Sequence, residues 1–153
     1  MEIVNERGVS GAVKFLLDRI IAVGAIAVVG LPFGLAWGFE HTTWTAGENY
    51  CFLLFFLCGT GVLGIGMVFE LRQIFRRVNE HNPFQRKNAA SLKRIAILAL
   101  GISVAYMIKT VFYISFLTII VAMAFLVFGL AGLVFSELFR QAVEVKEEND
   151  LTI

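Results

Sequence analysis

The sequence predicts an all-α integral membrane protein, a bundle of four transmembrane helices, and two observations carry that prediction. Of the 153 residues, 58% are hydrophobic and 16% are charged, whereas a soluble domain has about 45–50% apolar and about 25% charged residues. The apolar residues also form long runs, and a run of about 20 residues is the length of helix that crosses a bilayer core. Strands of a barrel would instead show alternating polarity, so the runs are predicted to be helices.

We treat residues 1–153 as a single membrane domain with two charge-free runs followed by one longer run. The longer run, residues 95–135, is interrupted only by Lys109. One straight helix over it would be about 60 Å long, about twice the thickness of the hydrocarbon core. A tight turn is therefore predicted between Lys109 and Phe116. The predicted spans are residues 20–39, 50–69, 95–113 and 116–136, which leave a polar hairpin at 70–94 and a tail at 137–153.

The distribution of positive charge predicts the orientation of the chain. The hairpin 70–94 holds seven of the thirteen Lys and Arg residues, whereas the loop 40–49 holds none. Short loops rich in Lys and Arg stay on the cytoplasmic side of a membrane. Both termini, the hairpin and the tail are therefore predicted to be cytoplasmic.

A stripe of glycines in the first span predicts close helix packing. Gly30, Gly34 and Gly38 are spaced by four residues, as in small-xxx-small motifs that let two helices approach. Two alternatives follow. The favoured one is packing against another helix of the same chain, and the other is the face of a homodimer.

The polar hairpin is predicted to consist of two helical arms. Apolar residues recur at i, i+3, i+4 and i+7 after the second span, which indicates an amphipathic continuation of that helix; they are Leu71, Ile74, Phe75 and Val78. Proline disfavours helix in the residue before it, so Asn82-Pro83 ends this arm. Asn82 is then the predicted N-cap of the next helix, with Pro83 as its first residue and Gln85 as the capping-box partner.

The fourth helix is also predicted to continue past the membrane into an acidic tail. Glu residues alternate there with apolar residues between Ser136 and Glu148. Because hairpin and tail lie on the same predicted side, we expect Arg86 or Lys87 to pair with Glu144 or Glu148. Such exposed pairs contribute only about 0–1 kcal/mol each.

Two segments resemble a known family. The first is Asn82-Pro83-Phe84-Gln85-Arg86-Lys87-Asn88 followed by Leu92-Lys93-Arg94-Ile95, and the second is Phe139-Arg140 with the ending Glu147-Glu148-Asn149-Asp150-Leu151-Thr152-Ile153. Together they resemble domain of unknown function 2975 (DUF2975), a family of small bacterial four-span proteins. The resemblance implies a multi-pass protein of the bacterial inner membrane without an established enzymatic activity. It also implies a partner, because members often occur beside a small helix-turn-helix protein of the phage-repressor type.

Neither a catalytic nor a metal site is predicted. His41 and His81 fall on opposite predicted sides of the membrane, and Cys51 and Cys58 have no His or acid nearby in the sequence. Metals need larger ligand sets than these. No nucleophile and base stand out as a pair either, so we expect a non-enzymatic protein without cofactors.

The functional hypothesis is a membrane protein that binds or sequesters a small cytoplasmic helix-turn-helix transcription regulator. The alternative is a small transporter or channel-like oligomer, which would need a polar path through the spans. Besides a protein partner, the basic hairpin has two further interpretations: attraction to anionic lipid and direct nucleic-acid binding, which is disfavoured because the patch lacks a recognition fold. The predicted partner-binding residues are Arg72, Arg76, Arg77, Pro83, Phe84, Arg86, Lys87, Lys93, Arg94, Glu144 and Glu148.

Overall fold

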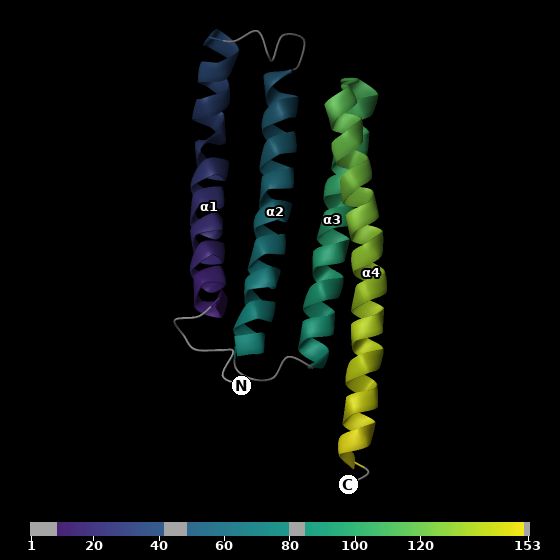
Figure 1. Cartoon of the computed structure of the whole chain (residues 1–153). Helices are drawn as coiled ribbons and strands as arrows, with labels where there is room; N and C mark the ends of the chain where they lie inside the picture. The colour runs from purple at the N-terminus through teal and green to yellow at the C-terminus, as the bar shows by residue number, and fades with distance from the viewer. Residues whose placement is uncertain (1–8, 42–48, 80–84, 152–153) are drawn as a thin grey trace.

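The computed structural model consists of four long helices that run up and down in turn (Figure 1). The structure describes residues 9–41, 49–79 and 85–151, and within these ranges it has no strand. Each helix is long and apolar enough to cross a membrane. The predicted all-α, four-span fold is thereby confirmed, while the orientation in the membrane stays a prediction. The helices are α1 (Val9–His41), α2 (Tyr50–Asn79), α3 (Arg86–Phe112) and α4 (Phe116–Leu151).

All four helices extend well beyond their predicted spans, and all the extensions lie at the same end. α1 begins at Val9 instead of residue 20 and α3 at Arg86 instead of residue 95, while α2 continues to Asn79 and α4 to Leu151. The continuations of α2 and α4 were predicted from their amphipathic patterns. At the opposite end, α3 stops at Phe112 and α4 starts at Phe116, which places the tight turn where it was predicted. The backbone N–H of Tyr113 donates to the carbonyl of Lys109 at 2.8 Å and so closes the last turn of α3.

The start of α3 differs from the prediction. The helix begins at Arg86, and Gln85 is its N-cap with extended backbone angles (φ −126°, ψ 144°) and no hydrogen bond from its side chain to the helix. The predicted role of Gln85 as a capping-box partner inside the helix is therefore wrong. Its proposed partners Asn82 and Pro83 lie outside the described residues.

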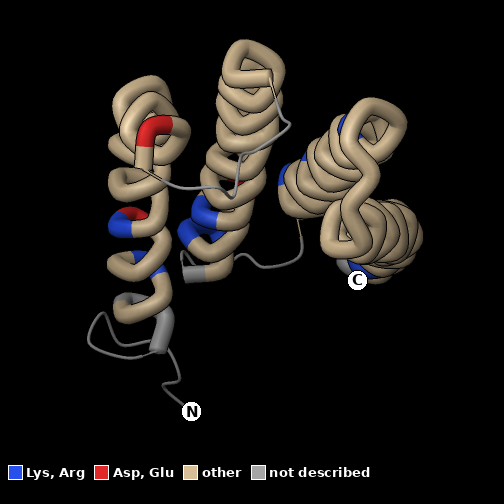
Figure 2. The backbone as a smooth tube through the Cα atoms, turned by 90° about the horizontal axis from the view of Figure 1, so that it is seen from above, with Lys and Arg blue, Asp and Glu red and all other residues tan. Residues whose placement is uncertain are grey.

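The four helices form an open row. In the described ranges, the backbones of α1 and α2, of α2 and α3, and of α3 and α4 approach within 8 Å, whereas no other pair does. Seen from above, α4 lies beside α3 and away from α1 (Figure 2). The bundle is therefore built from sequential neighbours and is not closed by a contact between its first and last helices.

Small residues allow the closest approach, between α3 and α4. A Cβ atom built on Gly129 would lie 2.7 Å from the Leu100 side chain, and one on Gly132 would lie 2.9 Å from the Cβ of Ala96. Ala96 is fully buried. The buried hydroxyl of Ser103 adds a hydrogen bond across this interface, since it donates to the Ala122 carbonyl at 2.8 Å. The α3–α4 pair is thus the most tightly packed part of the row.

Gly30 and Gly34 of the α1 stripe do not bring another described helix into close contact, which corrects the favoured prediction for these two glycines. A Cβ atom on Gly30, Gly34 or Gly38 would meet no described atom within 4 Å. α1 instead approaches α2 through Gly24, whose built Cβ lies 3.3 Å from Ile65. At 3.6 residues per turn, Gly30 and Gly34 lie roughly 100° around the helix from Gly24. The homodimer alternative for this stripe stays a prediction.

Candidate functional site

Charged side chains gather at the end of the row where α2 ends and α3 begins. We call this the basic end; it is the lower end in Figure 1, and it also holds the start of α1 and the end of α4. Two hollows lie there, one over α2 and one between α3 and α4. They contain most of the residues that the sequence marks as partner-binding.

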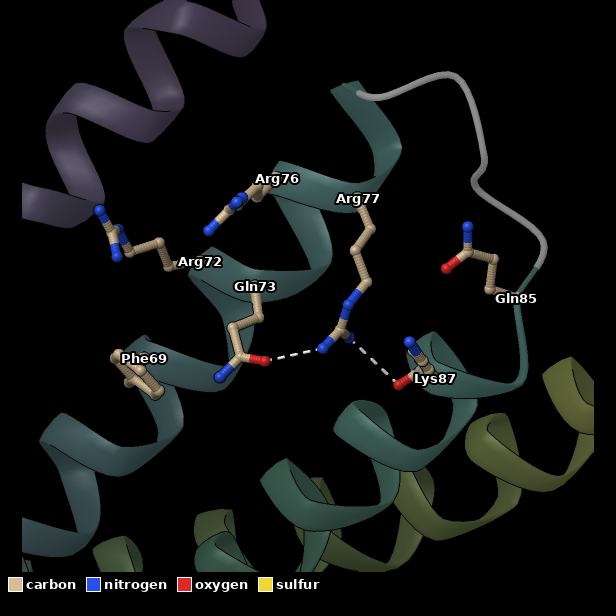
Figure 3. Close-up of a pocket in the computed structure, with 7 residues that line it drawn as sticks. All are labelled: Phe69, Arg72, Gln73, Arg76, Arg77, Gln85 and Lys87. Atoms are coloured by element: carbon tan, nitrogen blue, oxygen red, sulfur yellow. Dashed lines mark hydrogen bonds between the residues drawn. The ribbon is translucent and has the colours of Figure 1, made fainter.

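The first hollow, which we call the basic pocket, has a volume of about 490 Å³. It lies over the last turns of α2 beside the start of α3 (Figure 3). Its lining residues on α2 are spaced by three and four positions, so they share one face of the helix. They are Phe69, Arg72, Gln73, Arg76 and Arg77, joined by Gln85 and Lys87 from the start of α3.

Arg77 connects α2 to α3. One of its terminal nitrogens donates to the hydroxyl of Ser91 at 2.8 Å, to the amide oxygen of Asn88 at 3.3 Å and to the carbonyl of Lys87 at 3.2 Å. The other donates to the Gln73 amide oxygen at 2.7 Å. Ser91 and Asn88 are buried, with 0% and 3% of their surface exposed. Buried polar groups need such partners, so Arg77 has a structural part in holding the two helices together.

A second arginine extends this network. Arg94 of α3 pairs with Glu70 of α2 through a contact of 2.9 Å, and it also donates to the Ser91 hydroxyl at 3.3 Å. The Glu70 side chain is only 13% exposed. The Ser91 hydroxyl therefore lies between the guanidinium groups of Arg77 and Arg94. Together with Glu70, these side chains form a polar network that joins α2 to α3 at the basic end.

Arg72 is held by α1, the other neighbour of α2. It forms an ion pair with Asp18 of α1. In the close-up, Arg72 extends toward α1, whereas Arg77 extends toward α3 (Figure 3). The walls of the basic pocket are thus anchored to helices on both sides of α2.

The second hollow, which we call the polar groove, has a volume of about 440 Å³ and separates the start of α3 from the end of α4. Arg86 of α3 binds Glu147 of α4 with both nitrogens of its fork, at 3.1 and 2.6 Å from the same carboxylate oxygen. The groove is lined by Arg86, Ala89, Ala90, Lys93, Ser136, Glu137, Arg140 and Glu144.

Arg140 organises the acidic side of the polar groove. It pairs with Glu137 at 2.6 Å and with Glu144 at 3.3 Å, both within α4. The hydrogen bond from Arg140 lowers the pKa of the Glu137 carboxyl, while desolvation acts in the opposite direction. In the other ion pair, the hydrogen bond from Arg86 to Glu147 raises the pKa of the Arg86 guanidinium. All these groups are exposed, so solvent screens the attraction within each pair.

Comparison with known proteins places the chain in a family. The family model described as "Protein of unknown function (DUF2975)" matches residues 38–153. The chain belongs to the DUF2975 family. No curated protein and no solved structure matches it. The matched range contains α2, α3 and α4 complete and only the last residues of α1.

In this DUF2975 protein the predicted attraction between hairpin and tail is present, but with a different acidic partner. Arg86 pairs with Glu147, whereas the expected partners were Glu144 and Glu148. Glu144 is bound to Arg140 instead. The two segments therefore do make contact, with Glu147 in place of Glu144 as the partner of Arg86.

Eight of the eleven predicted partner-binding residues of the DUF2975 chain fall into three groups. Arg72, Arg76, Arg77 and Lys87 line the basic pocket, Arg86, Lys93 and Glu144 line the polar groove, and Arg94 belongs to the network beneath them. Glu148 is exposed on α4. Pro83 and Phe84 lie outside the described residues.

Sequence reasoning missed the neutral members of the site. Gln73, Asn88 and Ser91 supply the acceptors that hold Arg77. Their spacing carried a signal, because Gln73 and Arg77 are four residues apart and Asn88 and Ser91 are three apart, which places each pair on one helical face. Among the described residues, no group of three or more His, Cys, Asp or Glu side chains could hold a metal ion.

Proposed function

We propose that this membrane protein docks a small soluble protein at its basic end, on the polar groove between α3 and α4. The partner class is the one that the family resemblance implies, a small helix-turn-helix regulator that is thereby held at the membrane. The proposed role is non-enzymatic. The observation that carries the proposal is the exposed, mixed-charge groove formed where α4 extends beyond its apolar stretch.

The extension of α4 supports docking because it is polar and helical at the same time. From Ser136 to Leu151 the helix continues past the predicted span, with acidic and basic side chains exposed along it. An ordered helix beside the start of α3 offers a partner a fixed surface. A soluble protein that presents both carboxylates and cations would be complementary to it.

The ion pairs across the polar groove support exchange with a partner. The side chains of Arg86 and Glu147 are 67% and 48% exposed. Solvent screens such an exposed pair, so separating it costs little, and a partner that supplies substitute charges recovers that cost. The groove can therefore change from internal pairing to external pairing without disturbing the packed α3–α4 interface above it.

The transporter alternative has less support among the described residues. Two hydroxyls that could contribute to a polar path are occupied by backbone carbonyls: Thr60 donates to Phe56 at 2.8 Å and Ser103 donates to Ala122. The hollow of about 470 Å³ along α1, α2 and α3, which Phe125 of α4 also lines, is mostly apolar, and Thr60 and Tyr106 are its hydroxyl-bearing side chains.

Co-purification in detergent tests the proposal. The chain is co-expressed with a small helix-turn-helix protein of the phage-repressor type, as wild type, as Arg86→Glu, and as Lys14→Glu, a charge reversal on α1 at the same end. We expect wild type and Lys14→Glu to retain the partner and Arg86→Glu to retain at least about tenfold less, the effect of roughly 1.4 kcal/mol. Equal retention by all three proteins, or retention by none, would contradict docking at the polar groove.

A further inference from the structure

The basic pocket over α2 has properties that protein docking at the polar groove does not use. Four cationic side chains line it, Arg72, Arg76, Arg77 and Lys87, together with the amides of Gln73 and Gln85. None of the described residues that line it is acidic. A hollow lined in this way favours an anion.

Two of the cations are held in place before any ligand arrives. Arg72 is paired with Asp18 of α1, and Arg77 is held by Gln73, Ser91 and the start of α3. The four acceptors that Arg77 contacts among the described residues are neutral, so these contacts fix the guanidinium without cancelling its charge. A fixed cation loses less side-chain entropy on binding than a mobile one.

The kinds of donor in the basic pocket match a phosphate group. Guanidinium forks bind phosphate oxygens in pairs, and a lysine ammonium adds a compact charge. The pocket offers three guanidinium groups from α2, of which that of Arg72 is already paired with Asp18, and one ammonium from α3. Carboxylates are excluded from its described lining, and they would repel such a group.

The depth of the basic pocket selects among phosphate compounds. Phe69 lines one side of it, and residue 69 is the last residue of the predicted second span. The three arginines of the pocket, Arg72, Arg76 and Arg77, follow Phe69 on α2 within about two helical turns. The pocket therefore lies where the apolar run of α2 ends, which is the depth of lipid headgroups.

We infer that the basic pocket is a binding site for a phosphate ester, and that at this depth the phosphate is that of an anionic phospholipid headgroup. Arg72 and Arg77 also hold the helices together, so Arg76 and Lys87 are the two lining cations to substitute in a test. The site does not depend on the docking of a protein partner, because that partner would occupy the polar groove on the other side of α3.

Native mass spectrometry of the detergent-purified protein tests this site. The probes are phosphatidylglycerol and phosphatidylcholine of the same acyl composition, titrated separately. The variant is Arg76→Gln/Lys87→Gln. The control is Lys14→Gln/Lys146→Gln, which removes two charges from the same end outside the basic pocket. All three proteins are first compared by circular dichroism.

We expect wild type and control to bind one phosphatidylglycerol in preference to phosphatidylcholine. The Arg76→Gln/Lys87→Gln variant should bind it about 10- to 30-fold more weakly, from roughly 1 kcal/mol for each basic contact. Competition with inorganic phosphate on wild type separates the two sources of the group. Displacement of the lipid at millimolar phosphate assigns the site to free phosphate, and no displacement assigns it to the headgroup.

Equal affinity of variant and control for phosphatidylglycerol would overturn the assignment. So would a wild-type protein that does not distinguish the two lipids, a result that needs no variant. Loss of lipid binding in Arg76→Gln/Lys87→Gln with unchanged partner retention would separate this site from the proposed docking function.

Discussion

The hydrogen bonds of Arg77 predict that this residue stabilises the fold far more than its neighbour Arg76. Both are cations near the end of α2, and both line the basic pocket. Arg77 is joined to the buried Ser91 of α3, whereas the Arg76 side chain is exposed. Replacing each by alanine removes the same charge from the same helix, so the pair forms a matched comparison.

The expected magnitude follows from the two short bonds, to Ser91 at 2.8 Å and to Gln73 at 2.7 Å. A hydrogen bond with one charged partner contributes about 1.5–3 kcal/mol. Arg94 also reaches Ser91, and water can reach the partly exposed Gln73, so part of the loss is recovered. We expect Arg77→Ala to lower the free energy of unfolding by about 2–3 kcal/mol, and Arg76→Ala to change it by less than about 0.5 kcal/mol.

Unfolding in mixed micelles with increasing SDS, followed by circular dichroism, measures this difference. A loss of 2–3 kcal/mol corresponds to roughly a 30- to 150-fold change in the unfolding equilibrium. Arg77→Lys should recover only part of the stability, because an ammonium group cannot reproduce the planar fork. If Arg77→Ala and Arg76→Ala unfold at the same SDS fraction, the network does not hold α2 to α3 and the reasoning fails.

Three further predictions concern packing, a buried hydroxyl and pH. Gly129→Ala should destabilise the protein by about 1–3 kcal/mol through overpacking, whereas Gly34→Ala should be neutral or stabilising by up to about 1 kcal/mol; equal SDS unfolding midpoints would contradict the described packing. Ser103→Ala should cost about 0.6–2 kcal/mol in the same assay, and an unchanged midpoint would show that its bond contributes nothing. Because Arg140 lowers the pKa of Glu137 below its ordinary value of 4.5, this pair stabilises α4 above that value and is lost as the pH falls through the lowered pKa. Helicity measured by circular dichroism should therefore fall more on acidification in wild type than in Glu137→Gln, and identical profiles would refute the pairing.

The spans could be predicted from the sequence because a bilayer imposes few solutions. A charge-free run of sufficient length must form a helix in lipid, and a run twice that length must turn, as it does between Phe112 and Phe116. The amphipathic continuations of α2 and α4 followed from helical periodicity alone. These features depend on short stretches of sequence and not on how distant segments meet.

The details of the site depend on how distant segments meet, which the sequence does not contain. Whether Arg86 reaches Glu144 or Glu147 is decided by the register of α4 on α3, which Gly129 and Gly132 set through their contacts with α3. The glycine stripe of α1 had the right spacing for packing, yet the helix turns Gly24 toward α2. A spacing motif identifies a face that can pack but not the neighbour that it meets.

The open row of helices has a consequence for how the chain assembles during synthesis. Each described helix approaches only those next to it in sequence, so the contacts between helices have low contact order and require only short loops to close. All residues of the interface between α1 and α2 are synthesised before those of α3 and α4, since the chain is made from its N-terminus at about 5–20 residues per second. Assembly can therefore proceed hairpin by hairpin in chain order, and no helix has to wait for a partner that is made much later.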